Sequence, residues 1–148
     1  MIQRKQTIYL LLVVILTVVC MSSQVATMVS DSGKAFADMY NLWLTDAEGR
    51  HSFRSAPLFA CLMLSAILSL VTIFMYMKRK LQAMMCLVDM LLLVVWYILL
   101  AVMPQSIGGM MHLEWPAVLP AVGIILLFMA RKGILADEKL VRSLDRIR

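Results

Sequence analysis

Asp89 is the acidic residue of this chain whose position is most suggestive of chemistry, because it lies inside a long apolar run. It follows Lys80 by roughly two and a half turns of helix and stands in the middle of residues 81–103. An ionised carboxylate is costly in an apolar medium, so an acid in such a place is a candidate functional residue. The first candidate site is therefore centred on Asp89.

Hydroxyl side chains in the preceding apolar run, residues 57–77, are the candidate partners of Asp89: Ser65, Ser69 and Thr72. Counted outward from the basic link between the two runs, Ser69 lies at the depth of Asp89. One hypothesis is a proton- or cation-binding carboxylate in a polar seam, and the other is a hydrogen-bonded acid that locks two helices together. The structural hypothesis is favoured, because the runs contain no second acid or histidine with which to build a relay.

The remaining residues of chemical interest form no recognisable site. Cys20, Cys61 and Cys86 fall inside apolar runs, where cysteine packs as a small hydrophobe, although a Cys20–Cys61 bridge stays open. The fourteen methionines are scattered as packing residues are, rather than clustered as copper ligands. His51 and His112 lack metal-ligand spacing, and no nucleophile–base pattern or phosphate-binding glycine loop occurs. We therefore expect no enzyme activity, cofactor or metal.

The composition indicates that lipid surrounds most of the chain. Of its 148 residues 62% are hydrophobic, with a mean hydropathy of +0.87, against roughly 45–50% apolar residues in soluble domains. A domain of this size has too small an interior to bury such an excess. The net charge of +5 does not indicate nucleic acid, since the cations flank apolar runs instead of gathering with aromatic residues.

Four apolar stretches are long enough, or nearly so, to cross a bilayer as helices: residues 8–27, 57–77, 81–103 and 115–130. The first is expected to be retained, because no small-residue cleavage pattern follows it. The short link at Lys78–Lys80 makes the second and third an antiparallel hairpin. Pro104, Gly108 and Gly109 predict the end of the third helix, and Pro120 predicts a disturbed start of the fourth. The predicted fold is an all-α bundle of four transmembrane helices in a single membrane domain.

The basic residues fall on one side of these predicted spans. Eleven cations belong to the N-terminus, the central link and the tail 131–148, and three belong to the outer loops 28–56 and 104–114. The larger set is Arg4, Lys5, Lys78, Arg79, Lys80, Arg131, Lys132, Lys139, Arg142, Arg146 and Arg148, and the smaller is Lys34, Arg50 and Arg54. Because cytoplasmic segments carry the excess of Lys and Arg, both termini are predicted to be cytoplasmic and both loops periplasmic.

The longer outer loop supports two interpretations. Large apolar residues recur there at helical spacing: Phe36, Met39, Tyr40 and Trp43. That pattern would suit an amphipathic helix lying on the membrane. Alternatively, Tyr40, Leu42 and Leu44 alternate and residues 46–49 resemble a turn, which predicts a β-hairpin ending near Phe53. The hairpin is slightly favoured.

The C-terminal tail is amphipathic, and Glu138 lies four residues before Arg142, as in a helical ion pair. It also carries the cations of a candidate surface for anionic lipid or for a cytosolic or membrane protein: Lys139, Arg142, Arg146 and Arg148. A solvated helical extension of the fourth span explains the same pattern.

Three segments resemble a bacterial membrane-protein family termed domain of unknown function 4293: residues 1–12, the basic link at 79–82 and the ending at 137–148. The resemblance covers the whole chain and is most specific at these segments. It implies an inner-membrane protein with four spans and implies no activity.

Two functional hypotheses follow. The first is a non-enzymatic structural or accessory protein that acts through partner or lipid contacts. The second is a small proton- or cation-coupled transporter or channel subunit that uses Asp89. A polar cavity reaching Asp89 would favour transport, whereas a fully packed seam would favour the accessory role.

Overall fold

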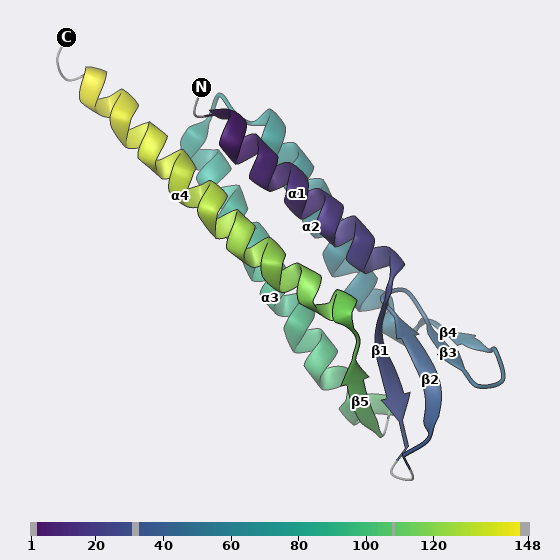
Figure 1. Ribbon diagram of the computed structural model, residues 1–148. Helices are drawn as coiled ribbons and strands as arrows, with labels where there is room; N and C mark the ends of the chain where they lie inside the picture. Colours follow the sequence, from purple (N-terminus) through teal and green to yellow (C-terminus); the bar gives the residue numbers. More distant parts are fainter. Residues whose placement is uncertain (1–2, 31–32, 108, 146–148) are drawn as a thin grey trace.

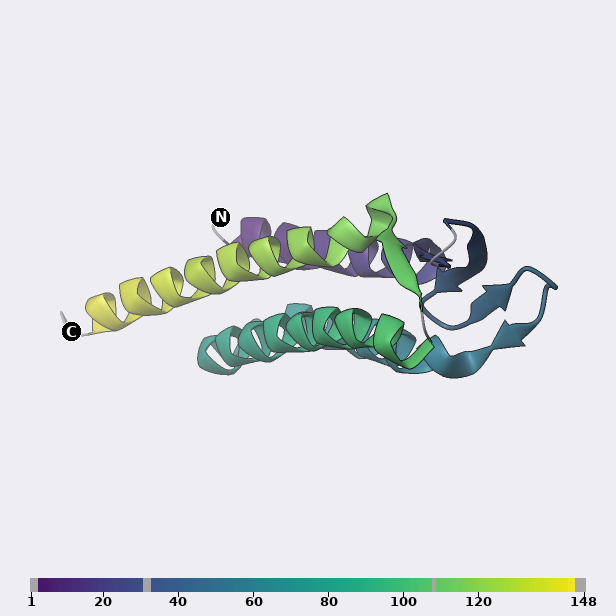
Figure 2. The same ribbon diagram turned by 90° about the horizontal axis from the view of Figure 1, so that it is seen from below.

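The computed structural model describes residues 3–30, 33–107 and 109–145, and its main feature is four long antiparallel helices. These are α1 (Gln3–Ser22), α2 (Ala56–Phe74), α3 (Arg79–Ile107) and α4 (Leu119–Asp145). Helices α1 and α4 form one layer and α2 and α3 the other, so that each helix packs against two neighbours (Figures 1 and 2). All four are long and apolar enough to cross a membrane.

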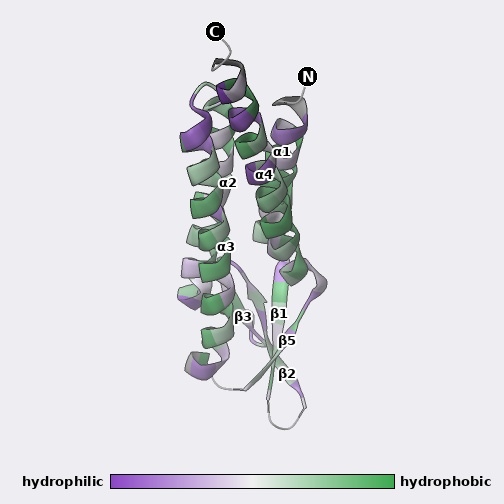
Figure 3. Ribbon diagram, turned by 90° about the vertical axis from the view of Figure 1, so that its left-hand side faces the viewer, coloured by the Kyte–Doolittle hydropathy of each residue, from purple (hydrophilic) through white to green (hydrophobic). Residues whose placement is uncertain are grey.

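Large apolar side chains point away from the core on all four helices. Ile15, Ile67, Leu91 and Ile125 are each about half exposed, at 49%, 50%, 56% and 60%. Figure 3 shows hydrophobic residues over the length of the helices and hydrophilic ones toward the ends. A continuous exposed surface of this kind is unfavourable in water and suits a lipid environment.

A five-stranded antiparallel sheet covers the end of the helices opposite the chain termini (Figures 1 and 3). Its strands are β1 (Gln24–Val29), β2 (Ala35–Tyr40), β3 (Leu44–Asp46), β4 (His51–Ser52) and β5 (Met110–Leu113). They lie in the order β4-β3-β2-β1-β5. Strand β1 pairs with β2 and also with β5, where Ala26 faces Leu113, so both outer loops contribute to one sheet.

The all-α prediction was therefore wrong in one respect, because both outer loops form strands. The interfacial-helix interpretation was also wrong, since residues 35–40 are strand β2. The favoured hairpin is confirmed from Leu44 onward, where Leu44 of β3 faces Ser52 of β4, but Tyr40 belongs to β2 and residues 41–43 are not strand. Phe36 and Met39 have helical spacing, yet both lie in β2, because backbone pairing with β1 outweighs the local pattern.

Several predicted span limits also differ from the structure. The first span, 8–27, runs too far, because residues 24–27 pair with β2 and β5 instead of continuing α1. The predicted loop 104–114 contains the last residues of α3 and all of β5. Pro104 does not end α3, since its missing N–H removes only one hydrogen bond near the end of the helix. Helix α4 continues through residues 131–145, as the helical-extension interpretation predicted.

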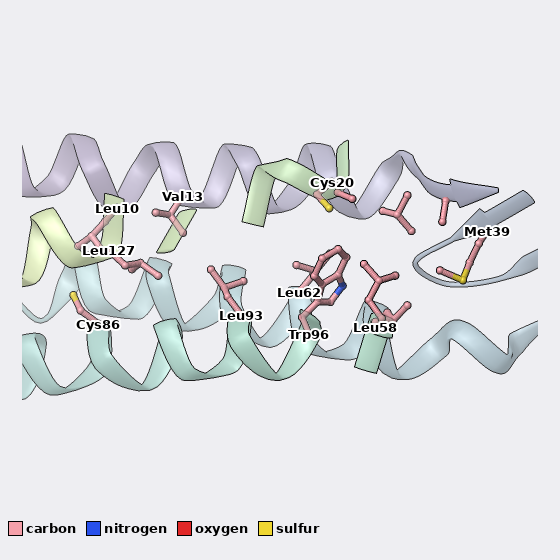
Figure 4. Packing of buried hydrophobic residues seen from close by; sticks show 14 of the residues in the cluster. Leu10, Val13, Cys20, Met39, Leu58, Leu62, Cys86, Leu93, Trp96 and Leu127 are labelled. Carbon is pink, nitrogen blue, oxygen red and sulfur yellow. The ribbon is translucent and has the colours of Figure 1, made fainter. Parts of the chain in front are cut away.

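The core lies between the two helix layers, and at one point α4 contributes a glycine to it. Gly123 of α4 faces this core, and a Cβ there would lie 3.3 Å from Leu93 Cδ1 and 3.9 Å from Val13 Cγ1. The missing side chain thus lets α4 approach α1 and α3 closely. Trp96 fills the wider space nearer the sheet, beside Leu62 (Figure 4).

The start of α4 is held by one tyrosine of α3. A short 3-10 turn, Trp115–Val118, precedes α4 and contains Pro116. The hydroxyl of Tyr97 donates to the Ala117 carbonyl at 2.6 Å and accepts from the Ala121 N–H at 3.0 Å. The Ala121 N–H is one of the first-turn donors that have no partner within a helix. Tyr97 therefore stabilises the region that Pro120 was expected to disturb.

Asn41, fully buried between β2 and β3, joins the sheet to three helices. Its side-chain Nδ2 donates to the Cys20 carbonyl of α1 at 2.7 Å, and its Oδ1 accepts from Trp96 Nε1 of α3 at 3.0 Å. Its own carbonyl accepts from the Phe59 N–H of α2 at 3.2 Å. One side chain thus satisfies polar groups at the sheet-side ends of two helices.

We predict that Asn41→Ala will lower the free energy of unfolding by about 2 kcal/mol or more, because two buried polar groups lose their partner. Thermal unfolding in detergent measures the loss. Alkylation of Cys20, which is buried in the native chain, should accelerate in parallel. Thr45→Ala is the matched control, since Thr45 contacts His51 on the exposed side. Equal stability of the two variants would contradict the assignment.

Candidate functional site

Asp89 of α3 lies against two serines of α2 in the middle of the apolar helices. The Ser65 hydroxyl donates to Asp89 Oδ1 at 2.5 Å, and the Ser69 hydroxyl donates to Asp89 Oδ2. All three residues have no exposed surface. The serines are at positions i and i+4, so both hydroxyls lie on the same face of α2, and each bonds one oxygen of the carboxyl group.

Thr72, the third candidate partner, does not contact Asp89. Its hydroxyl donates to the Leu68 carbonyl of its own helix at 2.7 Å. Its carbonyl accepts instead from Gln82 Nε2 of α3 at 3.0 Å. This carbonyl lies in the last turn of α2, where it also accepts from the Met75 N–H at 3.3 Å. Gln82 therefore adds one more hydrogen bond between α2 and α3. The sequence did not reveal this role, because a glutamine beside a basic link is usually solvent-exposed.

The contacts of Asp89 with Ser65 and Ser69 can hold α2 and α3 together by hydrogen bonds. Both carboxyl oxygens of Asp89 are hydrogen-bonded, and the residue is closed to solvent. A buried polar group whose partners are all supplied by the chain adds specificity to the packing of its helices. The structural hypothesis expects a fully packed contact around Asp89, and the transport hypothesis expects a polar cavity that reaches it. The observed burial of Asp89, Ser65 and Ser69 agrees with the structural hypothesis.

A second group of polar contacts lies at the end of the helices that carries the chain termini. Gln6 Nε2 of α1 donates to Asp137 Oδ2 of α4 at 2.5 Å, and both residues are buried. Arg79 Nη1 of α3 donates to the Asp137 carbonyl at 3.2 Å. Gly133 makes room for Gln6, since a Cβ there would lie 3.3 Å from Gln6 Cγ. These contacts anchor the segment from which the extension of α4 begins.

Glu138 completes this anchor on the exposed side. It lies 4.0 Å from Lys80 Nζ of α3 and 3.5 Å from Arg142 Nη2 of α4. The second contact is the i,i+4 pair predicted from the sequence. Among the other cations of the candidate tail surface, Lys139 is exposed, and Arg146 and Arg148 lie outside the described residues.

The cysteines and histidines form no further site in the part of the chain that the structure describes. Cys20, Cys61 and Cys86 are all free, so the Cys20–Cys61 bridge that the sequence left open does not form. No three His, Cys, Asp or Glu side chains of the described residues gather as metal ligands do. His51 instead contacts Thr45 at 3.1 Å across the β3–β4 hairpin.

The structure thus contains four helices long and apolar enough to cross a membrane and a small antiparallel sheet at one end of them. At the other end, buried hydrogen bonds join α1 to α4. The family model described as "Domain of unknown function (DUF4293)" matches residues 2–147. The chain therefore belongs to that family, which confirms the resemblance seen in the sequence. Comparison with curated proteins finds no match.

We predict that Asp89→Leu will destabilise the fold by about 1 kcal/mol, since hydrogen bonds between helices in lipid average about 0.6 kcal/mol each. Asp89→Asn should have a smaller effect, because the amide oxygen still accepts from one serine. Reversible unfolding in mixed micelles measures both.

A double-mutant cycle between Asp89→Leu and Ser65→Ala/Ser69→Ala isolates the contact itself. The effects of the two changes should be less than additive, because each removes the same hydrogen bonds. Strict additivity would show that the seam contributes nothing to the packing of α2 on α3.

Proposed function

We propose that this chain is an integral protein of the bacterial inner membrane with both termini in the cytoplasm. The arrangement of charge supports this orientation. The termini and the α2–α3 link lie at one end of the helices (Figures 1 and 3). The members of the larger set of cations that the structure describes belong to that end, whereas Lys34, Arg50 and Arg54 belong to the connections of the sheet. Lys and Arg are enriched in the cytoplasmic segments of membrane proteins.

Labelling of single cysteines tests this orientation. In a chain with its three native cysteines replaced by alanine, Glu48→Cys marks the exposed β3–β4 turn and Met77→Cys the exposed α2–α3 link. A membrane-impermeant maleimide should label position 48 in cells with a permeable outer membrane, and position 77 only after the inner membrane is opened. The reverse pattern would overturn the orientation. Recovery of the chain without detergent would overturn membrane insertion.

Within that membrane we propose a non-enzymatic accessory role, exerted through contacts with a partner protein. The observation that carries this proposal is the complete burial of Asp89 between Ser65 and Ser69. A transported proton or cation needs a path to its carboxylate, and here the two oxygens are held by hydroxyls of the adjacent helix. Among the described residues Asp89 is the only acid in the middle of the helices, and in this proposal its role is in packing.

The extension of α4 is the surface that we propose for the partner. It projects beyond the ends of α2 and α3 (Figure 2) and carries the apolar residues Leu140 and Val141, which are 56% and 43% exposed. Its base is held by Asp137 and Glu138 through contacts to both neighbouring helices. A rigidly held amphipathic helix with an uncovered apolar stripe suits recognition by a groove in another protein.

Photocrosslinking in native membranes tests the accessory role. A photoreactive phenylalanine analogue in place of Leu140 should give one discrete protein adduct. The same analogue in place of Phe74, which is 77% exposed on α2 at the same end of the helices, should give none. Adducts at neither position, together with a proton flux in liposomes that Asp89→Asn abolishes, would replace the accessory role with transport.

A further inference from the structure

A groove of about 430 Å³ lies between α1 and α4 at the end that carries the chain termini. Its residues come from the first turns of α1 and from the middle of α4: Lys5, Gln6, Tyr9, Phe128, Met129, Lys132, Gly133 and Ala136. The volume falls in the range of sites that hold small ligands. Gly133 has no side chain to fill it, and Gln6, held against Asp137, lies at its base.

Two cations lie at the rim of this groove. Lys5 of α1 and Lys132 of α4 are both exposed, and neither is ion-paired within the part of the chain that the structure describes. The nearby anions are engaged elsewhere, because Asp137 accepts from Gln6 and Glu138 lies beside Lys80 and Arg142. The two ammonium groups thus remain available to an anion from outside the chain.

On both helices of the groove a lysine lies nearer the end with the chain termini, and an aromatic residue lies one turn closer to the sheet. Tyr9 is one turn beyond Lys5 on α1, and Phe128 is one turn before Lys132 on α4. Because the helices are antiparallel, each step leads from the cationic end into the apolar region. Phe128 and Met129 are 56% and 45% exposed there. The groove is therefore positive at its outer end and apolar along its inner wall.

We propose that this groove binds an anionic phospholipid of the cytoplasmic leaflet, an inference that rests on the proposed membrane orientation. Lys5 and Lys132 hold the phosphate of the headgroup, and an acyl chain lies along Tyr9, Phe128 and Met129. Basic pockets between helices on the cytoplasmic side bind such headgroups. A free phosphate would use the two lysines but leave the apolar wall uncovered, whereas a phospholipid matches both parts.

Native mass spectrometry of the full chain in detergent tests the proposal. The probes are dioleoylphosphatidylglycerol, dioleoylphosphatidylcholine and inorganic phosphate. We expect saturable binding of the phosphatidylglycerol, at least about tenfold tighter than that of the zwitterionic lipid, because each cation near an anionic headgroup contributes on the order of fivefold. Inorganic phosphate should not displace it. Equal binding of the two lipids, or displacement by phosphate, would overturn the assignment.

Two matched variants separate this groove from general attraction to a basic surface. Lys5→Gln/Lys132→Gln should lose the tenfold preference, and Lys78→Gln/Lys139→Gln, which removes the same charge at the same end outside the groove, should keep it. Ala136→Trp, which fills the groove but keeps its lysines, should weaken binding as well. An equal loss in both double variants, or full binding by Ala136→Trp, would contradict the groove.

The labelling of positions 48 and 77 distinguishes failure of the lipid site from failure of the proposed membrane orientation. A chain with the expected labelling but no lipid preference would overturn the lipid site alone. A chain with reversed labelling would place the groove in the opposite leaflet and overturn both proposals.

Discussion

Polar groups buried among apolar helices have to satisfy one another, and the arrangement of this protein depends on that constraint. An unpaired polar group in such an interior destabilises the fold far more than a formed hydrogen bond stabilises it. Three of the four helix contacts, α2–α3, α1–α4 and α3–α4, contain such a pairing within the described residues. Asp89 is held by two serines between α2 and α3, and Gln6 is held by Asp137 between α1 and α4. Tyr97 joins α3 to the start of α4.

The same constraint explains why the outer loops form a sheet. Two connections, α1 to α2 and α3 to α4, lie at the same end of the helices. In each, backbone N–H and C=O groups outside the helices need hydrogen-bond partners. Strand β1 lies between β2 and β5 and pairs with both, so two loops far apart in the sequence satisfy each other's backbone. Asn41 then fastens the sheet to the helices through Cys20, Phe59 and Trp96.

The opposite end of the helices is organised by charge. Arg79 and Lys80 hold the base of the α4 extension through Asp137 and Glu138, which leaves the extension rigidly presented. Lys5 and Lys132 take no part in this network and face outward. The described cations at this end thus include some that contact neighbouring helices, such as Arg79 and Lys80, and others, Lys5 and Lys132, that form no ion pair within the described residues. At the sheet end Arg50 pairs with Glu48 within the same hairpin, and both side chains are exposed.

Much of this architecture could be predicted from the sequence, because it depends on residue type and local spacing. The apolar runs indicated four long helices, the link at Lys78–Lys80 required a hairpin, and four-residue spacing predicted the Glu138–Arg142 pair. Matching depth across the hairpin brought Ser69 to Asp89. Tertiary structure alone decided that residues 24–27 are strand and that β5 exists, since strand pairing joins segments more than eighty residues apart, such as Ala26 and Leu113. It also decided the roles of Asn41 and Gln82, because a polar residue shows its function only when its partners on other helices are in place.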